Sequence, residues 1–174
     1  MIYLATDHRG YELKEKIKTW LTEWGFEFED TGAFKYDEND DYPDFVHKAA
    51  EKVSADPENS KAIILGGSGQ GEAMVANRYK GVRAAVFYGP ILARGSIKRS
   101  LLKIFAPDIG YIAADVLKKK LDEVVKLSRE HNNSNVLSLG TFFIDEVIAK
   151  REIKLWLETP FSNEERHSRR IAKF

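Results

Sequence analysis

Two kinds of apolar pattern alternate along the chain. Short continuous apolar runs, which are typical of buried strands, occur at residues 2–6, 26–30, 61–65, 83–88 and 136–139. Between them, apolar side chains recur every three or four residues, as in helices. This spacing predicts helices over 11–24, from Pro43 past Val53, from the glycine-rich loop to about Tyr79, over 113–129 and over 144–157. Strands that alternate with helices favour a parallel sheet covered on both faces. We therefore expect one domain, residues 1–174, with a three-layer α/β/α Rossmann-like fold and a five-stranded parallel sheet.

Composition narrows the classes of function. Among the 174 residues, basic and acidic side chains are equal in number, 27 of each, so no overall field favours nucleic acid or an anionic membrane. The chain has no cysteine, which excludes disulfides and thiolate chemistry. No apolar run is long enough to cross a bilayer, and the first ten residues lack a basic leader and an apolar signal core. We expect a cytoplasmic protein without nucleic-acid or membrane partners.

Polar clusters follow three of the predicted strands. They read TDHRG at 6–10, GGSGQGE at 66–72 and YGP at 88–90. In open parallel sheets, ligands bind beyond the carboxyl ends of the strands. The coincidence of the three clusters with strand ends therefore predicts a binding site there.

The glycine-rich cluster has two interpretations. Glycines after a buried strand let the backbone approach a ligand, and the first N–H groups of the next helix favour an anion. The same cluster can be a tight strand–helix connection with Ser68 as the helix cap. It lacks the Lys-Ser/Thr ending of a nucleotide-binding P-loop and the glycine spacing of a dinucleotide fingerprint. From the loop alone, the functional and the connecting interpretation both remain open.

Six motifs in order resolve the choice. They read DHRGYELKEKI, DYPDF, GGSGQGEAMVANR, GVRAAV, REHNNSNVLSLG and ERHSRRI. In this order they resemble the type B ribose-5-phosphate isomerases, a family whose fold the galactose-6-phosphate isomerase subunits share. The resemblance covers nearly all of the chain except an insert at about 89–120.

The resemblance implies a glutamate as the catalytic base. Many members carry a catalytic cysteine at the place of Gly66, whereas a second branch has GGSG-x-GE and uses the glutamate, here Glu72. Isomerisation of an aldose to a ketose passes through an enediolate and needs a base over both carbons, with a pKa that burial can raise toward neutrality. Ser68 would contact O1 and O2, and the N–H groups of the loop glycines Gly67, Gly69 and Gly71 would stabilise the oxyanion. We expect no metal and no cofactor.

The resemblance also implies the remaining site residues. His131 would open the sugar ring and Asn132 would contact hydroxyls, both from the partner subunit of a homodimer or possibly a tetramer. Asp7 and His8 would bind hydroxyls and phosphate, Tyr42 would cover the ring, and Arg166 and Arg170 would hold the phosphate. From the residues alone, His131 can equally be a helix cap, Tyr42 a packed turn residue, and the basic tail at about 160–174 a solvated face.

The chain departs from the family pattern in two places. Members commonly carry an arginine just after the fifth strand as a further phosphate contact, where this chain has Phe142. The spacing from Arg83 to His131 is longer, and the insert brings four cations, Arg94, Lys98, Arg99 and Lys103. We hypothesise that the insert forms a lid or wall over the site and alters the choice of substrate.

The expected activity is an aldose–ketose isomerase that acts on ribose 5-phosphate to give ribulose 5-phosphate. Alternatives are the same chemistry on a tetrose or hexose phosphate, such as galactose 6-phosphate, and a non-catalytic protein that binds a sugar phosphate. Glu72, Ser68 and His131 together favour catalysis, because binding does not require a base over the carbons.

Overall fold

The structure is a computed structural model that describes residues 1–89 and 109–174. Its strands are β1 Ile2–Thr6, β2 Phe28–Asp30, β3 Lys61–Gly66, β4 Ala84–Phe87 and β5 Val136–Gly140. They form one sheet in the order β2-β1-β3-β5-β4, and every neighbouring pair is parallel. The predicted five-stranded parallel sheet is confirmed.

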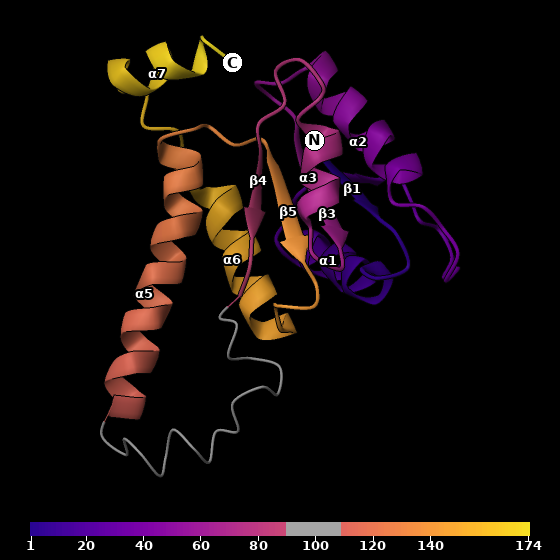
Figure 1. Ribbon diagram of the computed structural model, residues 1–174, viewed down its shortest axis with the longest axis horizontal. Helices are drawn as coiled ribbons and strands as arrows, with labels where there is room; N and C mark the ends of the chain where they lie inside the picture. The colour runs from indigo at the N-terminus through magenta and orange to yellow at the C-terminus, as the bar shows by residue number, and fades with distance from the viewer. Residues whose placement is uncertain (90–108) are drawn as a thin grey trace.

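Helices cover both faces of the sheet (Figure 1). In the described residues they are α1 Tyr11–Glu23, α2 Pro43–Ala55, α3 Gln70–Ala76, α5 Ile109–Glu130, α6 Glu146–Glu158 and α7 Glu165–Ile171. Residues of α1, α5 and α6 pack with the sheet in one apolar cluster, and residues of α2 and α3 pack in a second. The expected three-layer α/β/α architecture is therefore confirmed.

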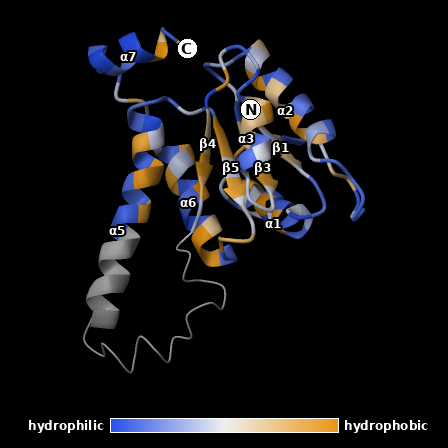
Figure 2. Ribbon diagram, in the orientation of Figure 1, coloured by the Kyte–Doolittle hydropathy of each residue, from blue (hydrophilic) through white to orange (hydrophobic). Residues whose placement is uncertain are grey.

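The two apolar clusters follow from the alternation of side chains along each strand. On β3, Ile63 and Leu65 join the cluster beneath α1 and α6, whereas Ala62 and Ile64 join the one beneath α2. All four are at most 1% exposed, as expected for a strand covered on both faces. Figure 2 shows this arrangement as hydrophobic strands between helices whose outer faces are hydrophilic.

Several helix ends differ from the predicted ones. Helix α3 ends at Ala76 rather than near 79, because the Asn77 side chain exchanges hydrogen bonds with the backbone of Ala84 at 2.7 and 3.1 Å. Helix α6 starts at Glu146, since Asp145 caps it through the Ile148 N–H at 2.9 Å. Ser68 is not the cap of α3, because Gly69 takes the N-cap position with a φ of +73°.

The predicted insert at about 89–120 falls partly outside the described residues. Arg94, Lys98, Arg99 and Lys103 lie there, and so does the lid that we hypothesised. The helix predicted over 113–129 is longer than expected, because α5 begins at residue 109. Within the described residues, neither α5 nor any other helix is long and apolar enough to cross a membrane.

Candidate active site

The carboxyl ends of β1 and β3 lie side by side in the middle of the sheet. Thr6 at the end of β1 pairs with Leu65 near the end of β3. The chain continues from β1 to β2 on one side and to β3 on the other, which makes this the point where the strand order reverses. Such a point is where open α/β sheets bind ligands. The TDHRG and GGSGQGE clusters therefore meet at one edge, as expected.

Hydrogen bonds from β5 and the segment after it fix the carbonyl groups of the glycine loop. Thr141 donates both its backbone N–H, at 2.9 Å, and its Oγ1, at 3.0 Å, to the Gly66 oxygen. Ser138 Oγ donates to the Gly69 oxygen at 2.5 Å. Neither residue was singled out from the sequence, since a Ser or Thr near a strand end carries no specific pattern. Together they hold the loop in one conformation.

The N–H groups of the same loop are free to bind a ligand. In the described part of the chain, the backbone N–H groups of Gly67, Ser68 and Gly69 have no hydrogen-bond partner. The Ser68 side chain is exposed, and its Oγ accepts a hydrogen bond from the Gln70 N–H at 3.3 Å. Consecutive free N–H groups after a buried strand form a binding site for an oxyanion.

Glu72 places a buried carboxylate at the end of β3. It lies in the first turn of α3 and is 4% exposed. A Cβ added to Gly66 would lie 1.6 Å from Glu72 Oε1, so the carboxylate occupies the space that a side chain at Gly66 would fill. No lysine or arginine of the described residues forms an ion pair with it.

The environment of Glu72 raises the pKa of its carboxyl above the ordinary 4.5. Burial is the main cause, because it disfavours the charged form, and the negative charge of Asp7 adds to it. A hydrogen bond to the backbone N–H of Glu72 itself acts in the opposite direction. Burial likewise raises the pKa of Asp7, which is 7% exposed and accepts a hydrogen bond from the Arg9 N–H at 2.8 Å. A buried carboxyl with a raised pKa makes Glu72 a candidate for a general base.

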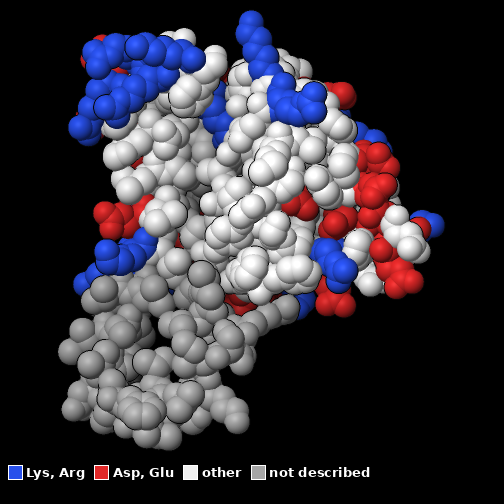
Figure 3. All heavy atoms as spheres, viewed as in Figure 1, with Lys and Arg blue, Asp and Glu red and all other residues white. Residues whose placement is uncertain are grey.

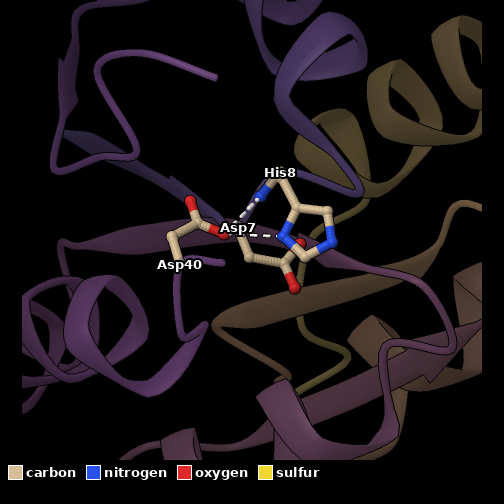
Figure 4. A group of neighbouring side chains, drawn as sticks. All are labelled: Asp7, His8 and Asp40. Atoms are coloured by element: carbon tan, nitrogen blue, oxygen red, sulfur yellow. Dashed lines mark hydrogen bonds and ion pairs between the residues drawn. The ribbon is translucent and has the colours of Figure 1, made fainter. Parts of the chain in front are cut away.

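Asp40 orients the ring of His8 (Figure 4). The His8 backbone N–H and ring Nδ1 both contact the same oxygen of Asp40, Oδ1, at 2.9 and 2.7 Å. Because a carboxylate only accepts hydrogen bonds, Nδ1 carries a proton in this arrangement. Nε2 then has no hydrogen-bond partner among the described residues. Asp40 was missed in the sequence because it is one of several acids in an irregular loop.

Asp7, His8 and Asp40 are also the one group in the described residues that could hold a metal ion. One ligand atom from each lies within 4.8 Å of the others. Asp40 Oδ1 and His8 Nδ1 contact each other at 2.7 Å, however, so these two groups already satisfy one another without an ion between them. The contacts are those of an acid that positions a histidine, and we assign no metal to them.

Tyr42 reaches the glycine loop from the start of α2. A Cβ added to Gly71 would lie 2.5 Å from the Tyr42 hydroxyl oxygen. The structure thus brings together at one edge most of the residues expected for the site, namely Asp7, His8, Tyr42, Gly67, Ser68, Gly69, Gly71 and Glu72.

The remaining expected residues lie at the opposite edge. His131 and Asn132 follow α5 and precede β5, whereas Glu72 follows the carboxyl end of the adjacent strand β3. A five-residue strand is about 16 Å long, so it separates them within one chain. His131 stacks on His167 of α7 with ring centroids 4.1 Å apart. Figure 1 shows α7 beyond the edge where the strands begin.

A basic surface surrounds α7 (Figure 3). Its exposed cations are Arg166, Arg169, Arg170 and Lys173. Arg166 pairs with Glu164 at 2.8 Å and Arg169 with Glu165 at 3.3 Å, while Arg170 has no ion pair in the described residues. Arg166 and Arg170, expected at the phosphate, therefore share the edge of His131.

Comparison with known proteins identifies the family. Residues 2–106 and 103–174 match the sequence model of a family described as ribose/galactose isomerase. The chain belongs to the ribose/galactose isomerase family. The ribose-5-phosphate isomerase B of Mycolicibacterium paratuberculosis is 34% identical over 170 residues, which cover 98% of this chain and 86% of that protein.

Solved structures of the ribose/galactose isomerase family extend the likeness to three dimensions. Ribose-5-phosphate isomerase B from Mycoplasma genitalium, solved with bound ribulose-5-phosphate, has a TM-score of 0.78 at 30% identity, covering 99% of this chain and 91% of that one. The enzyme from Thermotoga maritima has a TM-score of 0.74 at 32% identity, covering 99% and 94%. The expectation of a sugar-phosphate isomerase of this family is confirmed.

Replacing Gly66 by alanine is expected to displace the Glu72 carboxylate. Because the clash is with the flexible end of a side chain, the thermal unfolding midpoint should change by only about a few degrees. Misplacement of a catalytic group by about 1 Å can cost roughly a hundredfold in rate, so we expect kcat to fall by about tenfold to a hundredfold. Steady-state isomerase kinetics and thermal unfolding of Gly66→Ala measure both effects.

The double variant Gly66→Ala/Glu72→Gln is the control for this effect. Because the two changes act on one carboxylate, the double variant should be no slower than Glu72→Gln alone. If the kcat losses of the two single variants multiplied in the double variant, the two substitutions would not act on the same group.

Proposed function

We propose that this chain interconverts ribose 5-phosphate and ribulose 5-phosphate, with Glu72 as the base. The observation that carries the proposal is the position of the Glu72 carboxylate, which fills the space beside Gly66. In many family members a catalytic cysteine stands at the place of Gly66. Glutamate and cysteine thus reach the same point from different positions of one loop, so the chemistry of the family can proceed here without a thiol.

In the proposed mechanism Glu72 moves one proton between two carbons. Its ionised carboxylate removes the proton from C2 of the open-chain aldose, and the electrons form the enediolate as negative charge develops on O1. The free N–H groups of Gly67, Ser68 and Gly69 stabilise that charge. Protonated Glu72 then delivers the proton to C1. The exposed Ser68 hydroxyl contacts O1 and O2, while a proton passes from O2 to O1.

Asp7 tunes the base in this mechanism. Burial and the charge of Asp7 both favour the protonated form of Glu72, which brings its pKa closer to neutral pH. A base with such a pKa both removes and returns a proton readily. Asp7 can in addition accept a hydrogen bond from a sugar hydroxyl, and Tyr42 covers the ring from the start of α2.

Another sugar phosphate remains the second candidate. The family description names galactose beside ribose, and Phe142 stands where an arginine is common. A non-catalytic role accounts less well for a buried carboxylate with a raised pKa beside free N–H groups. The same assay with galactose 6-phosphate and a tetrose phosphate distinguishes these substrates.

We also propose that the protein is a homodimer whose sites are completed by the partner. His131, Asn132, Arg166 and Arg170 lie too far from Glu72 to meet it within one chain. Strand β4 is an edge strand with Ala84, Ala85 and Val86 only half-buried. Beside it lies a groove of about 330 Å³ between β4 and α3, where Met74 is 68% exposed. This surface is suited to pairing with a second copy, which brings the opposite edge of its own sheet to Glu72.

Glu72→Gln is expected to lower kcat for ribose 5-phosphate by about 10²–10⁴, the usual contribution of a general base. Ketose formation from purified protein measures it. Because the folded state raises the pKa of Glu72, ionised Glu72 costs stability at neutral pH, so the variant should be at least as stable as the wild type. Glu12→Gln, an exposed glutamate in the first turn of α1, is the control. Full activity in Glu72→Gln would refute the mechanism with Glu72 as base, but it would not refute the proposed reaction.

Asp7→Asn is expected to shift the acid limb of the pH profile. The base works ionised, so activity falls as the pH drops through the raised pKa of Glu72, at a pH above the ordinary 4.5. Without the charge of Asp7 that pKa is less raised, and the limb of log kcat/KM should move to lower pH. The pH at which the limb falls is the readout, because the plateau value of kcat/KM also reports lost substrate contacts. Asp44→Asn, an exposed acid of α2, should leave the limb in place, and an unmoved limb in Asp7→Asn would contradict the tuning.

Mixing Glu72→Gln with His131→Ala subunits tests the shared site. Each variant alone should be strongly impaired. In a mixed dimer, one site receives intact Glu72 from one chain and intact His131 from the other, whereas the second site lacks both. Random exchange should restore about a quarter of wild-type activity. If mixed dimers form and activity does not recover, the proposal that each chain completes the site of its partner is wrong.

A further inference from the structure

The ring of Phe142 forms part of the rim of the glycine loop. A Cβ added to Gly67 would lie 2.7 Å from that ring, and the Phe142 N–H donates to the Gly67 oxygen at 3.0 Å. The side chain is thus fixed directly beside the free N–H groups, and the residue is 47% exposed. A phenyl ring offers an anion no hydrogen-bond donor, so this part of the rim lacks the charge that the family resemblance leads one to expect.

Arg9 brings a positive charge to the same place. Its guanidinium carbon lies 5.6 Å from the centroid of the Phe142 ring, in the geometry of a cation–π contact. The backbone is fixed on both sides, because the Arg9 N–H donates to Asp7 Oδ1 at 2.8 Å and the Arg9 carbonyl, 3.2 Å from Thr141 Oγ1, shares the hydrogen of that hydroxyl with the Gly66 oxygen. Arg9 is therefore held on the loop that carries Asp7 and His8.

The guanidinium is available for a ligand. In residues 1–89 and 109–174 it forms no hydrogen bond and no ion pair, and Arg9 is exposed. A guanidinium that rests on an aromatic ring keeps the N–H donors of its edge for a planar or bidentate contact. Such a contact is the preferred way in which arginine binds phosphate.

The charges around Arg9 favour an anion at the rim rather than deeper in the site. Asp7 and Glu72 form an acidic interior, and they would repel a phosphate dianion. His8, the residue before Arg9, is half-buried, and Asp40 holds its ring. A substrate with its carbons over Glu72 therefore needs its phosphate at the rim, where Arg9 and His8 stand together.

We propose that Arg9, stacked on Phe142, binds the phosphate group of the substrate and takes over the contact that an arginine at the place of Phe142 makes elsewhere in the family. The ring serves as a platform that holds the guanidinium over the site. This rests on the proposed function insofar as the ligand is a phosphorylated sugar.

Arg9→Ala is the first test. It is expected to raise KM for ribose 5-phosphate, and Ki for inorganic phosphate as a competitive inhibitor, by about tenfold or more, the size of a lost charge-assisted hydrogen-bond pair. The value of kcat should stay within about twofold, because the guanidinium does not contact the reacting carbons. Arg9→Lys should lie between the wild type and Arg9→Ala, since lysine keeps the charge without the bidentate fork.

The double variant Arg9→Ala/Phe142→Arg tests the exchange of positions. An arginine on the rim at 142 should recover most of the lost affinity for substrate and for inorganic phosphate. Lys154→Ala is the matched control, because Lys154 on α6 is a cation 5.6 Å from the centroid of the Trp24 ring, on a different aromatic pair. It should change neither KM nor Ki.

Two outcomes would overturn the proposal. One is a KM and a Ki for Arg9→Ala within about twofold of the wild type, whether or not the unfolding temperature falls. The other is a loss in Arg9→Ala that arginine at 142 does not recover at all. If the wild type proves inactive on ribose 5-phosphate, the proposed function fails by itself. Calorimetric binding of inorganic phosphate to the wild type and Arg9→Ala then still decides the role of Arg9.

Discussion

The missing side chain at Gly66 is the constraint on which the site depends. Because nothing projects from the end of β3, the carboxylate of Glu72 can fold back from the first turn of α3 and fill that space. Burial there raises its pKa, and the glycine loop that creates the space also supplies free N–H groups beside it. The proposed base and the proposed oxyanion site thus arise from one local choice of residues.

The loop keeps this geometry because its carbonyls are fixed from the neighbouring strand. Thr141 and Ser138 bond to the oxygens of Gly66 and Gly69, so the loop cannot turn its peptide groups over and bury the N–H groups. The same segment continues into Phe142, whose ring lies on Gly67. The anchor of the loop and the aromatic contact of Arg9 are therefore one piece of chain, which couples the position of the proposed phosphate contact to that of the proposed oxyanion site.

The direction of the strands separates His131 and the arginines of α7 from Glu72. In a parallel sheet every strand begins at one edge and ends at the other, so residues before β5 and residues after β3 cannot meet in one chain. His131 and the arginines of α7 instead gather at the edge where the strands begin. This separation is the ground for the proposed homodimer, in which two copies each contribute one edge to a shared site.

The sequence by itself determined the alternation of strands and helices, the parallel sheet and the polar clusters at its edge. Those features are local, since a buried strand needs a continuous apolar run and a covering helix needs an apolar stripe. Helix ends were less predictable, because α3 stops where the Asn77 side chain bonds to Ala84. Six ordered motifs led to the family and to Glu72 through resemblance rather than through physics.

Only the tertiary structure revealed Asp40 behind His8, Thr141 beneath Gly66 and Arg9 over Phe142. The members of these pairs are 32, 75 and 133 positions apart, and irregular loops bring them together, so no periodic pattern announces them. The structure also decided which expected residues share an edge and which do not. The physical reason is that the order of strands in a sheet, which no single segment encodes, sets the neighbours of each strand end.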